Sequence, residues 1–269
     1  MKYRLLAFDI DGTLTNSRKE ITPRTKEAVF KAIDAGATVA IATGRPVHGA
    51  VGYARELKLK ENGGYILSLN GGMIVRCSDD AIISKSLLPH EYYREIYRLA
   101  SECGVNIMTY DGDTVVSEKI DDPYLSEEAR LNGLGKKQVG NLLEYLDYEV
   151  PKFLMLGDGD MLAGVEKKVY ERLHDRMDVY RSEPYFLEIL PKNVNKASAL
   201  KKLTGIIGVD RSELMAFGDG FNDVSMIEFA GTGVAMGNAN DKAKESADII
   251  APGNDEDGIA WVIDNFVLD

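Results

Sequence analysis

Residues 3–14 read YRLLAFDIDGTL, a short apolar run that stops at an Asp-x-Asp-Gly sequence. The run Tyr3–Ile10 predicts a buried β-strand, because it is short, apolar and closed by a turn dipeptide. Residues two apart near a strand end point the same way, so the carboxylates of Asp9 and Asp11 would face each other. At about 4 Å they would repel by about 4 kcal/mol at an effective dielectric near 20, unless a proton or a cation relieves them. By itself such a sequence is more often a turn than a catalytic pair.

Strand-like and helix-like segments alternate on both sides of this run. Thr22-Pro23 is typical of a helix start, since threonine caps a helix and proline suits its first position. The pattern then predicts a helix to about residue 35, a strand at 38–42, a helix to about residue 59, a strand at 65–69 and a short returning strand at 73–76. The alternation resumes at Asn195, with helices expected at 196–203, 222–229, 241–246 and 258–266, and strands at 214–217, 233–235 and 249–250. This order predicts an α/β fold with a Rossmann-like parallel-sheet core and helices on both faces.

The middle of the chain has a different pattern, in which hairpin-like strand pairs replace the strict alternation. Helices are expected at 89–103 and 160–174, and strands at 106–110, 114–117, 152–156, 178–182 and 185–190. Such a mixture predicts a separate α+β domain inserted into the core. We therefore expect a core made of residues 1–83 and 186–269, and an inserted domain at residues 84–185.

The composition excludes several classes of protein. The chain has 269 residues, and 43 acidic against 32 basic side chains give a formal net charge of −11. A surface this acidic repels nucleic acid and anionic lipid at long range, so neither is an expected partner. No apolar run approaches the roughly 20 residues of a membrane span, and the apolar patch near the N-terminus is too short for a signal peptide. We expect a cytoplasmic protein that is a monomer or a weak homodimer.

A second acidic cluster, GDGFND at residues 218–223, follows another apolar run and opens another expected helix. Asp219 comes just past the expected strand end, and Asn222 and Asp223 lie at the expected helix start. Capping of the helix is the alternative role for each of these three residues, although one helix needs only one cap. Three oxygen-bearing side chains within five positions also suit Mg²⁺, which prefers hard oxygen ligands.

Further polar residues lie where expected strands end or helices begin. The hydroxyl of Thr43 and the N–H groups that follow, from Gly44 onward, can bind an oxyanion, although a helix cap is the simpler role of Thr43. Lys196 begins a helix, where the positive end of the helix dipole disfavours a cation. A bound anion would explain a lysine at this position, and a lysine exposed to solvent is the alternative. Arg45 and Asn70 also lie at strand ends, which makes each a candidate substrate contact. Because ligands bind at the carboxyl ends of parallel strands, we expect one shared site that holds a phosphoryl group.

These motifs resemble those of the haloacid dehalogenase-like (HAD) phosphohydrolase superfamily, specifically its Cof-type branch, subfamily IIB, which has a large α/β cap. The resemblance covers nearly the whole chain, and the order and spacing of the motifs agree. The matching segments are Asp9–Leu14, Ala42–Pro46, Lys196 and Gly218–Asp223. One departure is Ala197, where relatives often carry glycine, and we expect only a slight backbone change there. The resemblance implies that the inserted domain is a cap that closes over the substrate and reads its leaving group.

The resemblance also implies a role for each motif residue. Asp9 would attack phosphorus and form an aspartyl phosphate, while Asp11 would protonate the leaving group and then deprotonate a water molecule. Mg²⁺ would be held by Asp9, the backbone carbonyl of Asp11 and Asp219. Asp223 would support the metal through water or orient Lys196. The phosphoryl oxygens would be held by Thr43, Gly44, Lys196 and Asn222.

The predicted function is therefore a Mg²⁺-dependent phosphatase that hydrolyses small phosphorylated metabolites, with sugar phosphates as the expected substrates. A phosphomutase, which returns the phosphoryl group to a second hydroxyl, is the alternative among enzymes. A non-catalytic phospho-aspartate signalling module also uses aspartates, a threonine and a lysine on a parallel sheet. The inserted domain and the second carboxylate at Asp11 count against that module.

Overall fold

The computed structural model describes residues 2–268, and they fold as two compact units. The core unit comprises Met1–Ser84 and Asn195–Asp269, and the inserted unit comprises Lys85–Val194. The first junction lies within one residue of the predicted one. The predicted second junction, between residues 185 and 186, is wrong, because the strand that follows it pairs with two strands of the inserted unit. Local hydropathy identifies a strand but does not say which sheet it joins.

The core unit is built on one eight-stranded sheet of order β14-β13-β12-β1-β2-β3-β4-β5. The pairs from β14 to β3 are parallel, and β4 folds back antiparallel to β3, as the sequence predicts. The strands are β1 (Leu5–Phe8), β2 (Thr38–Ala42), β3 (Tyr65–Ser68), β4 (Met73–Arg76), β5 (Ala81–Lys85), β12 (Leu214–Gly218), β13 (Thr232–Ala235) and β14 (Ile249–Ile250).

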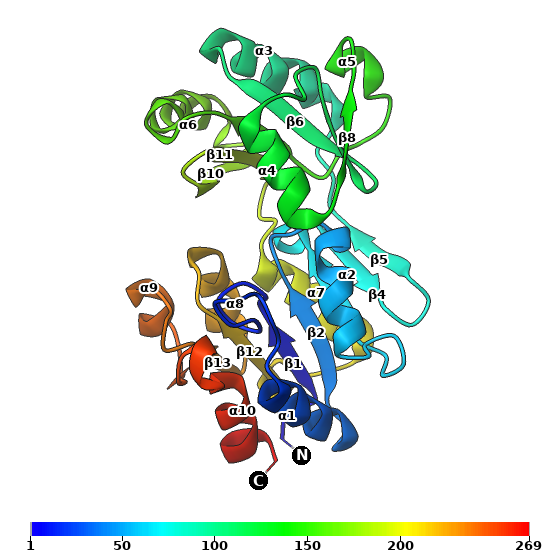
Figure 1. Cartoon of the computed structure of the whole chain (residues 1–269), viewed down its shortest axis with the longest axis vertical. Coiled ribbons are helices and arrows are strands. Elements are labelled where there is room, and N and C mark those ends of the chain that lie inside the picture. The colour runs from blue at the N-terminus through cyan, green and yellow to red at the C-terminus, as the bar shows by residue number, and fades with distance from the viewer. Residues whose placement is uncertain (1, 269) are drawn as a thin grey trace. The chain divides into compact units, whose positions relative to one another are not determined.

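Helices cover both faces of this sheet (Figure 1). On one face, apolar residues of β1 and β2 pack with α1 (Pro23–Asp34), α2 (Val47–Glu56) and α10 (Gly258–Val262), which continues as a π-helical segment, Ile263–Val267. On the other face they pack with α7 (Lys196–Ile207) and α8 (Val224–Phe229). The short α9 (Asp241–Glu245) packs near the edge against β13. The predicted α/β class and Rossmann-like core are confirmed.

The inserted unit is built on a six-stranded sheet of order β10-β11-β9-β6-β7-β8. Its strands are β6 (Asn106–Asp111), β7 (Thr114–Ser117), β8 (Gly135–Gln138), β9 (Phe153–Leu156), β10 (Met177–Glu183) and β11 (Phe186–Pro191). One face packs against α3 (Tyr93–Cys103), α5 (Leu142–Tyr145) and α6 (Gly159–Leu173). The helix α4 (Pro123–Asn132) packs against β7 and β8. Across both units, the described residues include five short 3-10 segments: Leu69–Gly71, His90–Tyr92, Arg211–Glu213, Phe221–Asp223 and Asn254–Glu256.

Two elements that the sequence analysis did not predict differ in their local signals. The helix α4 has them, with Asp122 as its N-cap, Pro123 at its first position and Gly133 after its end. The strand β8 reads Gly-Lys-Lys-Gln with all its residues exposed, so no alternation of apolar and polar positions marks it. It forms because β7 offers a parallel partner edge. Among residues 2–268, no helix is both long enough and apolar enough to cross a membrane.

Candidate functional site

The site is built on the carboxyl end of β1, at the middle of the core sheet. β1 pairs with β2 on one side and with β12 on the other. The connection after β1 leads to β2, whereas the connection after β12 leads the other way to β13, so the strand order reverses between β1 and β12. Such a switch point leaves a crevice outside the strand ends, where ligands of open α/β sheets bind. Asp9 directly follows β1, Thr43 follows β2 and Asp219 follows β12. The topology therefore brings together residues from distant motifs.

Lys196 is the buried cation of this crevice. Its Nζ lies 2.5 Å from Oδ1 of Asp9 and 2.5 Å from Oδ1 of Asp223, and its side chain is 0% exposed. Asn195 caps the N-terminus of α7 with its side chain, which directs the first helical residue toward the strand ends. Burial alone would lower the pKa of Lys196, but the carboxylates of Asp223 and Asp9 outweigh burial and hold the pKa above its usual value. The unfavourable position of this lysine on the helix dipole is thus compensated by two carboxylates.

Asp9, Asp219 and Asp223 form a carboxylate cluster. One oxygen of each lies within 4.8 Å of one oxygen of the others. Burial, together with the nearby charge of Asp223, raises the pKa of Asp9 from 3.8 to about 8, although Lys196 opposes the rise. Burial and the charge of Asp223 also raise the pKa of Asp219, to about 6, against a hydrogen bond from Thr13. Burial is the main cause of both shifts, and the charge of Asp223 adds to it at each carboxyl.

This cluster fits a divalent cation. Carboxylate oxygens are the ligands that Mg²⁺ prefers, and a cation would stabilise the charged carboxylates against burial and against their mutual repulsion. The Oγ1 of Thr13 donates a 2.7 Å hydrogen bond to Oδ1 of Asp219 and fixes that side chain. Gly12 has φ +84°, and a Cβ there would lie 2.4 Å from Oδ2 of Asp219. Gly12 therefore has no side-chain atom that would displace the carboxylate of Asp219.

Asp11 belongs to a separate charge system. Its Oδ2 accepts a 2.7 Å hydrogen bond from Nε of Arg45, and its Oδ1 accepts one of 2.7 Å from Nη2 of the same guanidinium. Lys19 adds a third, from Nζ to Oδ1 at 2.8 Å. Burial alone would raise the pKa of Asp11, but the hydrogen bonds from Arg45 and Lys19 hold it below its usual value. Asp9 and Asp11 thus each contact a cation, which relieves the repulsion expected between two neighbouring carboxylates.

The residues predicted to hold the phosphoryl oxygens lie around the same strand ends. Thr43 is buried, and its Oγ1 accepts a 3.1 Å hydrogen bond from the N–H of Arg45. The Nδ2 of Asn222 donates a 3.0 Å hydrogen bond to Oδ1 of Asn70. A Cβ on Gly44 would lie 3.1 Å from that same oxygen. The structure therefore brings these residues together, while their contacts with a substrate stay predictions.

Several contributors were not predicted from the sequence. Thr13 lies inside the first motif, but no role was assigned to its hydroxyl. Lys19 lies outside every motif. Only its basic side chain and its place in the turn after the first strand could have indicated a role near the carboxylates. Asn240 donates a 3.0 Å hydrogen bond from Nδ2 to the backbone carbonyl of Asp219, across a sequence separation of 21 residues that no local pattern predicts.

Comparison with known proteins agrees with this geometry. A family model described as haloacid dehalogenase-like hydrolase matches residues 6–263. The 5-amino-6-(5-phospho-D-ribitylamino)uracil phosphatase YcsE of Bacillus subtilis (strain 168) is 31% identical over 267 residues, which cover 98% of this chain and 96% of that protein.

Solved structures match over the same length. A haloacid dehalogenase-like hydrolase from Bacteroides thetaiotaomicron is 43% identical with a TM-score of 0.92, covering 98% of this chain and 99% of that one. The HAD subclass IIB sugar phosphatase BT4131 is 26% identical with a TM-score of 0.81, covering 99% of this chain and 100% of that one. The resemblance inferred from the motifs is confirmed across both units. This chain belongs to the haloacid dehalogenase-like hydrolase family and is a phosphatase of that family.

Proposed function

We propose that the protein hydrolyses phosphate monoesters of small metabolites in two steps, through an aspartyl phosphate at Asp9 and with Mg²⁺ as its cofactor. The observation that carries this proposal is the pairing of Lys196 with Asp9 and Asp223 at the switch point of the sheet. A buried ammonium beside the nucleophile attracts a phosphate dianion and stabilises the charge that spreads over its oxygens during transfer.

In the first step, an oxygen of Asp9 bonds to phosphorus while the bond from phosphorus to the leaving oxygen breaks. Asp11 supplies the proton that the leaving oxygen takes up, so the product departs as an alcohol. This step requires Asp11 to bind a proton against the hydrogen bonds from Arg45 and Lys19, which favour its charged form. Thr43, the N–H of Gly44 and the amide of Asn222 hold the phosphoryl oxygens together with Lys196. Their position after the carboxyl ends of β2 and β12, the two neighbours of β1, supports this assignment.

In the second step, water attacks the aspartyl phosphate and gives a proton to the carboxylate of Asp11. The bond between phosphorus and Asp9 breaks, orthophosphate leaves, and both side chains return to their starting states. Asp9, Asp219 and the backbone carbonyl of Asp11 would hold Mg²⁺, with Asp223 supporting it. The bound ion supplies positive charge that neutralises the carboxylate cluster and the phosphoryl group.

Phosphorylated polyhydroxy compounds are the proposed substrates. The relative BT4131 is described as a sugar phosphatase, and the relative YcsE acts on a compound with a phosphoribityl chain. Both descriptions name a phosphate ester on a hydroxylated carbon chain. We propose that the inserted unit, Lys85–Val194, selects among such compounds.

The test measures phosphate release from a panel of about a hundred phosphorylated metabolites, with wild-type protein and with Asp9→Asn. We expect Asp9→Asn to lose at least about a thousandfold in rate, because no other group replaces the nucleophile. Asp34→Asn on the exposed side of α1 is the matched control and should keep full activity. Substantial turnover by Asp9→Asn would refute the nucleophile.

The same assay separates the alternatives. Rearranged ester without free phosphate would identify a phosphomutase, and a long-lived phosphoprotein without phosphate release would identify a signalling module. Chelation by excess EDTA tests the metal. A rate that EDTA leaves unchanged would exclude the proposed cofactor.

A further inference from the structure

The turn after β3 has an unusual backbone. Three successive residues, Leu69, Asn70 and Gly71, have positive φ values of +55°, +54° and +97°. This conformation costs free energy for a residue with a Cβ, and a bulky residue such as Leu69 adopts it rarely. Leu69 and Asn70 are also buried, at 5% and 4% exposed. Strain of this kind persists only where the surrounding contacts fix the backbone.

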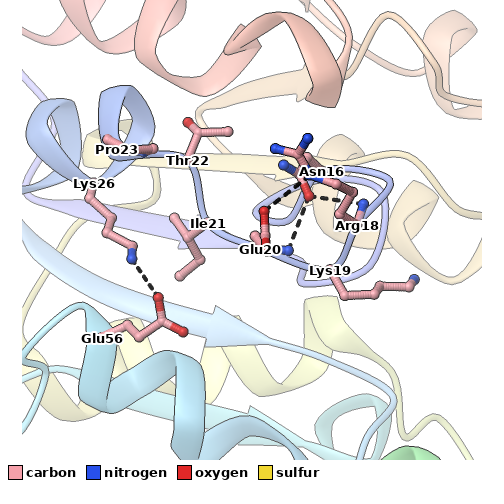
Figure 2. Close-up of a pocket in the computed structure, with 9 residues that line it drawn as sticks. All are labelled: Asn16, Arg18, Lys19, Glu20, Ile21, Thr22, Pro23, Lys26 and Glu56. Carbon is pink, nitrogen blue, oxygen red and sulfur yellow. Dashed lines mark hydrogen bonds and ion pairs between the residues drawn. The ribbon is translucent and has the colours of Figure 1, made fainter.

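A single left-handed residue is enough for an exposed turn of the same unit. Figure 2 shows such a turn around Lys19, which has φ +61°. There the side chain of Asn16 accepts hydrogen bonds from the N–H groups of Arg18 (3.0 Å) and Glu20 (3.1 Å). Those partners lie within the turn itself, whereas the turn after β3 contacts three segments that are distant in the sequence.

Backbone hydrogen bonds join the turn after β3 to the segment that follows β2. The N–H of Leu69 donates a 3.0 Å hydrogen bond to the carbonyl of Arg45, and the N–H of Asn70 donates one of 3.0 Å to the carbonyl of Thr43. Thr43 and Gly44 are the residues proposed to hold phosphoryl oxygens. The turn therefore fixes the backbone that carries them.

Gly71 brings the turn against the start of α7. A Cβ on Gly71 would lie 2.4 Å from the backbone carbonyl oxygen of Asn195 and 3.0 Å from the Cβ of Ala199. Glycine allows this close approach between two backbones because it has no Cβ. Asn195 caps α7 and directly precedes Lys196, so the turn packs against the residue from which that lysine is placed.

The side chain of Asn70 contacts the fourth motif. Its Oδ1 accepts a 3.0 Å hydrogen bond from Nδ2 of Asn222. Asn222 is itself exposed, so its amide would rotate freely without a fixed partner. An amide nitrogen carries two hydrogens, and holding one of them on Asn70 gives the other a defined direction. Because Asn70 is 4% exposed, a supporting role fits it better than the substrate contact that its place in the sequence suggests.

We propose that the turn Leu69–Gly71 is a positioning element of the phosphate site, in which Asn70 orients the amide of Asn222 toward the phosphoryl group. The strained backbone holds the segment after β2 and the start of α7 in a fixed relation to that amide. The inference rests on the proposed function, in which Thr43, Lys196 and Asn222 hold the phosphoryl oxygens. Asn70 itself touches no phosphoryl oxygen and acts through Asn222.

A double-mutant cycle tests whether Asn70 acts through Asn222. The value of kcat/KM for 4-nitrophenyl phosphate and the inhibition constant of inorganic orthophosphate are measured at constant Mg²⁺. The proteins are the wild type, Asn70→Gly, Asn222→Ala and the double variant. Glycine removes the amide of Asn70 and keeps the positive φ without strain. Lys58→Gly is the matched control, because Lys58 has φ +51° in an exposed turn of the same unit.

We expect Asn70→Gly to lower kcat/KM about tenfold and to raise the inhibition constant of orthophosphate by a similar factor, because a misdirected donor no longer meets the phosphoryl oxygen. In the Asn222→Ala background the same substitution should change either value by less than about twofold. Lys58→Gly should change neither value. Equal losses in the two backgrounds would show that Asn70 acts independently, as a direct substrate contact does, and would overturn the positioning role. Wild-type values for Asn70→Gly would overturn it as well.

Gly71→Ala tests the backbone part of the proposal. Its Cβ overlaps the carbonyl of Asn195, whereas a Cβ on Gly36, at a similar φ of +102°, meets nothing within 4 Å. Activity is compared at a temperature at which circular dichroism shows both variants to be folded. We expect Gly71→Ala to lose kcat/KM and Gly36→Ala to keep it. Equal values for the two variants would show that the close packing of the turn on α7 is not needed.

The proposed function has its own control in this experiment. If the wild type releases no phosphate, or if Asp9→Asn hydrolyses the ester, the proposed function fails and the role of the turn fails with it. If Asn222→Ala matches the wild type, Asn222 holds no phosphoryl oxygen, and the inference fails with that assignment. If Asp9→Asn and Asn222→Ala are both impaired while Asn70→Gly matches the wild type, only the role of the turn is wrong.

Discussion

The ammonium of Lys196 lies 2.5 Å from Oδ1 of Asp9, across a sequence separation of 187 residues. The contact joins the first residue of α7 to the residue that follows the central strand of the core sheet. It holds the predicted nucleophile against a fixed positive charge inside a buried site.

Lys196→Met should lower kcat/KM at least about a hundredfold, because a buried donor aimed at developing charge contributes that much to transfer. The variant should also unfold at lower urea concentration, since two carboxylates then remain buried without their cation. Lys201→Met, on the exposed side of the same helix, is the control and should change neither quantity. Near wild-type turnover by Lys196→Met would contradict the assignment of this lysine.

The stability of the metal-free protein should fall as the pH rises from about 4 to about 8. Asp9 and Asp219 have pKa values of about 8 and about 6 when folded, against an ordinary value of 3.8. In that range the folded state binds more protons than the unfolded state, so each step upward in pH favours unfolding. Urea denaturation at several pH values in the presence of EDTA measures the slope.

Added Mg²⁺ should remove most of that slope, and its stabilising effect should be largest near pH 8, where the carboxylates are least protonated. The comparison is the same denaturation series with Mg²⁺ in place of EDTA. Coincident curves at pH 8 would exclude a cation at this cluster.

Gly12→Ala and Gly36→Ala should separate backbone strain from displacement of Asp219. Both glycines have positive φ, at +84° and +102°, so each substitution should cost about 1 kcal/mol of stability. A Cβ on Gly36 meets nothing within 4 Å, whereas a Cβ on Gly12 overlaps the carboxylate of Asp219. Only Gly12→Ala should therefore lose activity, as measured by phosphate release. Equal activity in the two variants would show that Asp219 tolerates the shift.

The inserted unit contains a buried ion pair whose loss should be costly. Nζ of Lys152 lies 3.0 Å from Oε2 of Glu188, with side chains 4% and 5% exposed. Lys152→Met leaves the carboxylate buried without its cation and should lower the free energy of unfolding by about 3–5 kcal/mol. Adding Glu188→Leu should recover most of that loss, since both charges are then gone. Urea unfolding of the single and double variants measures the coupling.

Much of the fold could be predicted from local patterns. The strand at 38–42 and the helix that starts after Thr22 are found where hydropathy and capping residues predict them. Between Ser117 and Val150 the local signals are uneven, since Asp122, Pro123 and Gly133 mark the helix α4, whereas the strand after it has no such pattern. That strand, β8, is polar and exposed, and it exists only because a neighbouring strand offers hydrogen-bond partners. The sheet membership of β11 depends on a long-range pairing for the same reason.

Local sequence patterns specify which side chains follow the strands, because an apolar run followed by Gly, Asp or Thr indicates a strand and its turn. What each of those side chains contacts depends on the folded chain. Asp9 and Asp11 are two positions apart and chemically identical, yet the pKa of Asp9 is raised and that of Asp11 is lowered. Burial beside Asp223 dominates at the first, and hydrogen bonds from Arg45 and Lys19 dominate at the second. Those surroundings come from distant parts of the chain and exist only once it is folded.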